Sequence, residues 1–170
     1  MKLFPIAFTF LAASAAIAQN PISTDAKMVW QIASGNAVKS AEKMPEESYA
    51  FKPSHDVRNF GQLVGHVSDA AYMFCSAAKG EARAPVNIEK TKTTKADLVA
   101  AVKEAMAYCD AIYNDMTDAQ GSEMVKFFGG DRTRLGVLNF NNAHTMEHYG
   151  NMVTYMRIRG IVPPSSEPRR

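Results

Sequence analysis

Four long stretches of the chain carry apolar residues three or four positions apart, and no stretch shows the alternation of a convincing strand. The stretches cover residues 24–43, 59–78, 94–116 and 133–159. Connections rich in polar residues, glycine and proline separate them, above all residues 79–93 and 117–132. Four helices of this length predict an all-α fold, and the natural way to bury their apolar faces is a four-helix bundle.

Capping residues mark the expected helix ends. Asn59 followed by Gln62 has the pattern of a capping box, and Thr94 precedes the third helix as a cap. Residues 23–25 (Ser-Thr-Asp) are the cap candidates of the first helix. Gly160 follows the last helix, where a left-handed residue commonly ends a helix.

The predicted core follows from the apolar stripes of the first three helices. The stripe of the second helix contains Phe60, Leu63, Val67, Ala70, Ala71 and Phe74. That of the third helix contains Leu98, Val102, Ala105, Cys109, Ile112 and Met116. On the first helix the stripe is predicted to be Met28, Val29, Ile32, Ala33, Asn36, Ala37 and Ala41.

Composition excludes some classes of protein. The chain has 170 residues, of which 46% are hydrophobic and 21% charged, as expected for one globular domain. Its net charge is only +2, and no block of lysine and arginine stands out. We therefore expect no nucleic-acid partner.

The N-terminus has the pattern of a secretory signal peptide. Lys2 precedes the apolar run of residues 3–16, and Ala16-Ile17-Ala18 has the small-x-small form of a cleavage site. We expect residues 1–18 to be removed, which leaves a bundle of residues 19–164 and a C-terminal tail of residues 165–170. The alternative is an uncleaved N-terminal anchor. Cleavage predicts an exported protein, periplasmic or secreted, that no membrane holds afterwards.

Export changes the meaning of Cys75 and Cys109. In an oxidising compartment two cysteines can form a disulfide. Two buried free thiols are the alternative, and the spacing of the two residues does not decide between these states.

One group of residues has the pattern of a metal site. His144 and His148 lie four positions apart, on one face of the last helix, and His66 lies at the edge of the apolar stripe of the second helix. Three neutral imidazoles that leave one position for water are typical of catalytic zinc sites. The alternative is that the three are hydrogen-bonded core residues. His55 lies in a loop, where we expect a solvated or capping side chain.

Glu147 makes the segment read H-T-M-E-H, formally the inverzincin pattern of metallopeptidases. That reading needs an acidic ligand downstream, and Glu167, in the tail, is the only acid after His148. We interpret Glu147 as a flanking residue or as one that orients an imidazole. Asp69 is interpreted as an exposed carboxylate or as a partner of His66. The residues expected to line a substrate pocket are Trp30, Asn141, Tyr149 and Tyr155.

The segments 44–70 and 144–165 resemble the DinB/YfiT-like superfamily of metal-dependent proteins. They carry a histidine on the second helix, H-x-x-x-H-Tyr-Gly on the last and the ending Gly-Ile-Val-Pro-Pro. The resemblance implies an up-down-down-up four-helix bundle, often a homodimer. It also implies a divalent metal, commonly zinc or nickel, held by His66, His144 and His148. Some members of that superfamily are thiol-dependent transferases or isomerases.

The topology implied by the resemblance bears on the cysteines, because it makes the second and third helices parallel. Cys75 and Cys109 then lie at nearly the same height, sixteen residues after Asn59 and fifteen after Thr94. An antiparallel pair would offset them by about 15 Å along the axis, at a rise of about 1.5 Å per residue, whereas a disulfide needs Cα atoms within about 7 Å. The resemblance therefore predicts a contact between the two cysteines, and a disulfide.

Three hypotheses for function follow. The first is an exported metal-dependent hydrolase or transferase that acts on an unknown small molecule. The second is a module that binds or senses a metal without turnover. The third is a purely structural helical bundle whose histidines belong to the core.

Overall fold

The computed structural model describes residues 20–82 and 85–168. The predicted signal peptide lies outside the described residues, so its cleavage stays a prediction. Within the described ranges, no helix combines the length and the apolar character needed to cross a membrane.

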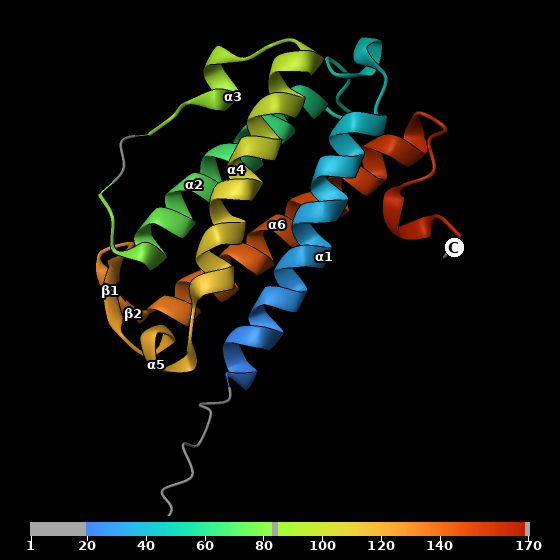
Figure 1. Cartoon of the computed structure of the whole chain (residues 1–170). Coiled ribbons are helices and arrows are strands. Elements are labelled where there is room, and N and C mark those ends of the chain that lie inside the picture. The colour runs from blue at the N-terminus through green and yellow to red at the C-terminus, as the bar shows by residue number, and fades with distance from the viewer. Residues whose placement is uncertain (1–19, 83–84, 169–170) are drawn as a thin grey trace, which may run out of the picture.

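Four long helices form the body of the molecule (Figure 1). They are α1 (Pro21–Lys43), α2 (Phe60–Lys79), α4 (Lys95–Asp115) and α6 (Arg134–Ile158). Helices α1 and α2 each pack against both α4 and α6, and the buried side chains of all four form one core. In Figure 1, α2 and α4 run in one direction, and α1 and α6 run in the other. The predicted all-α class is confirmed.

The capping signals placed three of the helices correctly. The side chain of Asn59 accepts a hydrogen bond from the backbone N–H of Gln62, and the Gln62 side chain accepts one from the backbone N–H of Asn59. Thr94 caps α4 by accepting a bond from the backbone N–H of Asp97. Gly160 follows α6 with φ 74°, as its position predicted.

Helix α1 begins earlier than predicted, and another part of the chain caps it. Its first residue is Pro21, whose missing N–H costs nothing at that position. The carboxylate of Asp118 accepts hydrogen bonds from the backbone N–H groups of Ile22 and Ser23. Local sequence could not reveal this cap, because Asp118 lies almost a hundred residues away along the chain.

The predicted core face is right for α2 and α4 and partly wrong for α1. The residues of the α2 stripe are all buried, and α4 buries its stripe up to Ile112. On α1, however, Met28, Val29 and Ile32 are exposed, whereas Trp30 is fully buried among alanines and serines. Small side chains let α1 approach its neighbours closely, so the helix buries small residues and leaves larger ones outside.

A small hairpin in the segment 117–132 contradicts the expectation that no strand is present. Strands β1 (Met124–Phe127) and β2 (Gly130–Thr133) pair antiparallel, after a short helix α5 (Asp118–Gly121). The turn residues Phe128 and Gly129 both have positive φ, 48° and 76°, as a two-residue hairpin turn of type I′ requires. Four-residue strands are too short to show a clear alternation, so periodicity missed them.

The connection between α2 and α4 is also more ordered than predicted. It contains a one-turn helix, α3 (Ile88–Thr91), which packs against α2. Short 3₁₀ turns at Glu46–Ser48 and Pro164–Ser166 complete the described chain.

Cys75 of α2 and Cys109 of α4 form a disulfide, with Cα atoms 5.5 Å apart. Both residues are fully buried, so the bond lies in the core between two adjacent helices. The side-chain amide of Asn141 on α6 points at this pair, with Nδ2 3.5 Å from the Cys75 sulfur. The predicted contact is confirmed, and with it the disulfide.

We predict that the variant C75A/C109A loses stability. The bond joins residues 34 positions apart, and loop closure of that length restricts the unfolded chain by about 2–4 kcal/mol. Urea unfolding should show this loss in the double variant. A reductant should lower the unfolding midpoint of the natural protein and leave that of the variant unchanged. Two titratable thiols in the unfolded, unreduced protein would contradict the account.

Candidate metal centre

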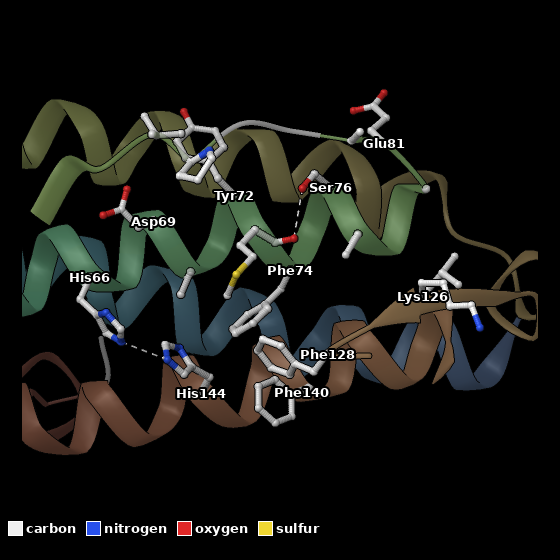
Figure 2. Close-up of a pocket in the computed structure, with 18 of the residues that line it drawn as sticks. His66, Asp69, Tyr72, Phe74, Ser76, Glu81, Lys126, Phe128, Phe140 and His144 are labelled. Atoms are coloured by element: carbon white, nitrogen blue, oxygen red, sulfur yellow. Dashed lines mark hydrogen bonds between the residues drawn. The ribbon is translucent and has the colours of Figure 1, made fainter. Parts of the chain in front are cut away.

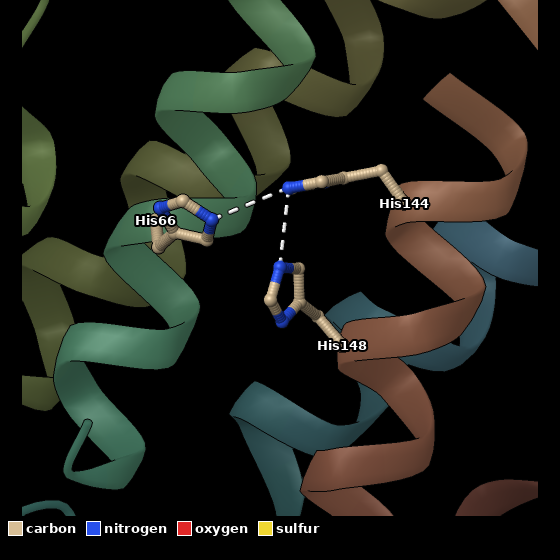
Figure 3. A group of neighbouring side chains, drawn as sticks. All are labelled: His66, His144 and His148. Carbon is tan, nitrogen blue, oxygen red and sulfur yellow. Dashed lines mark hydrogen bonds between the residues drawn. The ribbon is translucent and has the colours of Figure 1, made fainter. Parts of the chain in front are cut away.

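Three histidine rings meet between α2 and α6 (Figure 3). His66 projects from α2, and His144 and His148 project from consecutive turns of α6. The Nε2 atom of His144 lies 3.2 Å from Nε2 of His66 and 3.1 Å from Nε2 of His148. The same nitrogen of each ring therefore points to one place, as ligands of a single ion do.

The cluster fits a divalent metal by two tests. Two nitrogens bound at 2.0–2.1 Å to one tetrahedral ion lie about 3.3 Å apart, close to the distances between these rings. Imidazole is also a donor that suits zinc, nickel, copper and iron. Among the described residues, these histidines form the one group whose ligand atoms lie near enough together, within 4.8 Å, to hold an ion.

The surroundings keep the three rings neutral near pH 7. Burial is the main cause that lowers the pKa of His144 to about 4, and the neighbouring His148 and His66 contribute to the same shift. Burial is also the main cause that lowers the pKa of His66 and of His148. Neutral imidazole is the form that binds a metal, so protons compete weakly for this site.

A glutamate that the sequence analysis did not single out holds the ring of His66. Glu89 on α3 places Oε2 3.3 Å from Nδ1 of His66, and its other oxygen accepts a bond of 2.9 Å from Arg58. A carboxylate on the far nitrogen fixes the tautomer that leaves Nε2 free, and it makes that nitrogen a stronger ligand. This pairing is typical of metal-binding histidines.

Two residues of α2 explain why α3 lies at this point. The carboxylate of Asp69 accepts hydrogen bonds from the backbone N–H groups of Ile88 and Glu89, at 2.7 and 3.0 Å. A Cβ at Gly65 would lie 2.6 Å from the Cα of Glu89, so only glycine permits this approach. The sequence predicts Asp69 to be an exposed carboxylate or a partner of His66. In the structure it instead positions the segment that carries Glu89.

The two histidines of α6 have different environments. Nδ1 of His148 lies 3.4 Å from the side-chain amide nitrogen of Asn151. With the amide turned, the amide oxygen can accept a hydrogen bond from Nδ1–H. Nδ1 of His144 is buried with no hydrogen-bond partner among the described residues. The ring of Phe74 packs against His144 edge to face, with centroids 5.2 Å apart.

The other residues singled out from the sequence lie elsewhere. Glu147 and His55 are exposed, and the ring of His55 pairs with Asp56. Of the expected pocket residues, Tyr149 bonds Ser165, Tyr155 bonds the backbone of Arg58, and Asn141 faces the disulfide. Trp30 stacks on Tyr113, with ring centroids 4.9 Å apart. These four residues stabilise the bundle and do not meet the histidines.

A cleft of about 900 Å³ opens beside the cluster, and His66 and His144 line one part of it (Figure 2). Its walls come from α2, from the connection that follows α2, from the hairpin and from α6. A ligand in this cleft would therefore lie against two of the three histidines, His66 and His144.

The fold and the cluster together define a class: an all-α protein with three histidines gathered between two of its long helices. The model of the DinB superfamily matches residues 31–152, and the chain belongs to that superfamily. This finding confirms the resemblance seen in the sequence.

Individual relatives agree with this assignment. The uncharacterized protein YjoA of Bacillus subtilis is 26% identical over 123 residues, which make up 71% of this chain and 79% of YjoA. A DinB-like protein from Bacillus cereus has a similar structure, with a TM-score of 0.72 at 18% identity over 83% of this chain and 95% of its own. The structure of YjoA gives a TM-score of 0.69 at 23% identity, over 86% and 99%.

We predict that Glu89→Gln weakens metal binding by about 10- to 100-fold, the usual effect of losing such a partner. The matched control is Glu147→Gln, which removes the same charge from an exposed position next to His148. Titration of the metal-free protein with zinc against a competing chelator measures the zinc affinity of both variants. Equal affinities in the two variants would contradict the role assigned to Glu89.

Proposed function

We propose that this protein is an exported metal-dependent hydrolase or transferase that acts on a small molecule. The observation that carries the proposal is that Nε2 of His144 lies 3.2 Å from Nε2 of His66 and 3.1 Å from Nε2 of His148, with the ligand atoms of all three rings within 4.8 Å of one another. His66, His144 and His148 would hold a divalent ion, with zinc or nickel the metals we propose. Such an ion supplies a Lewis acid that polarises a substrate carbonyl and lowers the pKa of a bound water.

The residues of the chain itself prepare this chemistry. Glu89 holds His66 in the tautomer whose Nε2 is free, and burial keeps all three rings unprotonated. Three protein ligands leave a further position for water or substrate, which is typical of catalytic rather than structural zinc sites. The cleft beside His66 and His144 gives a substrate access to that position.

The cleft also favours an enzyme over the other two hypotheses. A module that only stores or senses a metal needs no cavity of this size at the metal. A purely structural bundle would have no reason to bury three imidazoles whose nitrogens converge, because each protonated ring would repel the others. The proposal therefore joins the histidine cluster to the cleft.

Two features support the proposed export. The N-terminal segment has the pattern of a signal peptide, and the core holds a disulfide, a bond that is common in oxidising compartments. N-terminal sequencing of the protein recovered from the periplasm or medium tests this directly. A chain that begins at Gln19 would support export, and an intact N-terminus inside the cell would contradict it.

We predict one metal ion per chain when the protein is purified without a histidine tag. His144→Ala and His66→Ala should each lose the ion, because two imidazoles hold zinc far more weakly than three. His55→Ala is the matched control, since this exposed histidine lies outside the cluster and its loss should leave one ion bound. Elemental analysis of the four proteins gives the result, and a stable, metal-free natural protein would contradict the proposal.

Activity separates an enzyme from a metal-binding module. The metal-loaded protein should cleave some members of a panel of esters and amides, or transfer a group to a thiol acceptor. His144→Ala should abolish that activity, and His55→Ala should preserve it. Full metal loading with no activity on any of these classes would favour the binding module.

A further inference from the structure

The cleft is mainly apolar, and His66 and His144 line only one part of it (Figure 2). Along α2 its wall includes His66, Ala70, Met73 and Ala77. These positions recur three or four residues apart, so they lie on one face of the helix. From His66 to Ala77 this face extends about 16 Å, at about 1.5 Å per residue.

Aromatic rings form the wall nearest the cluster. Phe74 of α2 packs edge to face against Phe140 of α6, with ring centroids 5.2 Å apart, and at the same distance against His144. Phe128 of the hairpin lies 5.9 Å from Phe140 and 6.2 Å from Phe74. Three separate elements thus contribute rings to one surface that leads to the metal ligands.

Phe128 is held over the cleft at a cost. Its φ is 48°, a left-handed value that is uncommon for a bulky residue, and 69% of its surface is exposed. Glycine or asparagine would adopt this turn conformation with less strain. Because most of the Phe128 side chain is exposed, its burial adds little stability to offset that strain. A strained residue that keeps a large apolar side chain at the mouth of a cleft points to a binding role.

The charged groups of the cleft already have partners. Asp69 accepts its two bonds from α3, Glu81 pairs with Lys79 at 2.6 Å, and Lys126 pairs with Asp131 at 2.7 Å. The lining therefore favours neither an anionic nor a cationic ligand body.

We propose that this cleft binds an elongated amphiphilic small molecule, with an uncharged alkyl or aryl body along Met73, Phe140 and Phe128 and a polar head at the three histidines. The inference rests on the proposed function, because the head binds the metal. It adds the substrate class, which is an ester, amide or thioester of an apolar acid and not a small polar metabolite.

A series of hydroxamates tests the proposal on zinc-loaded protein. Acetohydroxamate provides the metal-binding head alone, and phenylalkyl hydroxamates of increasing length add an apolar body. Calorimetry should show affinity rising with length, by up to about fourfold for each methylene group that becomes buried. A flat series would overturn the inference and leave the metal site untouched.

Variants locate the apolar body. The longest hydroxamate should bind the natural protein more tightly than acetohydroxamate does. Met73→Ser and Phe128→Asn should each reduce this gain in affinity by tenfold or more. Phe128→Asn removes the ring and keeps the hairpin, because asparagine adopts positive φ readily. Met28→Ser is the matched control: Met28 is 53% exposed on α1, against 47% for Met73, and lies outside the cleft. It should leave the gain unchanged, and all variants should bind acetohydroxamate equally.

Further outcomes separate this inference from the proposed function. If the protein binds neither zinc nor acetohydroxamate, the proposed function is wrong, and this inference falls with it. That conclusion holds even if a neutral apolar dye such as Nile red still binds the cleft. An equal loss of gain in Met28→Ser and Met73→Ser would overturn the assignment to this cleft. A dimer that light scattering finds in the natural protein but not in Met73→Ser would also overturn it, since a second copy would then cover the cleft.

Discussion

The approach of α2 to α6 is the constraint on which the proposed chemistry depends. It brings Nε2 of His66 within 3.2 Å of the corresponding atom of His144, across 78 residues of sequence. Imidazoles this close and partly buried are stable only while they stay neutral, and their lowered pKa values show that the site favours that form. A metal would convert this costly arrangement into a stable one, because the ion would take the lone pairs of the converging nitrogens.

Several contacts around the cluster keep this approach in place. The Cys75–Cys109 disulfide ties α2 to α4 nine residues beyond His66. Asp69 and the small size of Gly65 hold α3 against α2 beside His66, where Glu89 reaches the ring. The helix that carries His66 is thus held at two points. His66 also lines the cleft, so the contacts that position this histidine would also position a substrate bound there.

Local signals in the sequence predicted the long helices well, because caps and stripes such as those of α2 act over a few residues. They failed where distant residues decide the structure: Asp118 caps α1, and Asp69 caps α3. The stripe of α1 was wrong at Met28, since close packing of small residues outweighed side-chain hydrophobicity. The hairpin was missed because its strands are short, although Gly129 marked the turn.

The histidine triplet could be predicted from helical spacing and family resemblance, and the structure brings those three rings together. The carboxylate that holds the ring of His66 could not be predicted in this way. Glu147 is adjacent to His148 in sequence but points outward, whereas Glu89 reaches His66 through a four-residue helix that no periodicity reveals. The aromatic wall of the cleft likewise joins residues from α2, α6 and the hairpin turn, whose proximity exists only in the folded chain.

X-ray absorption spectroscopy of the metal-loaded, tag-free protein tests the central claim most directly. We predict a first shell that contains three imidazole nitrogens at about 2.0–2.1 Å and at least one oxygen from water. The absorption signal of the bound metal should be lost when His66 is replaced by alanine. A shell built from oxygen or sulfur ligands, or one unchanged in His66→Ala, would contradict the account.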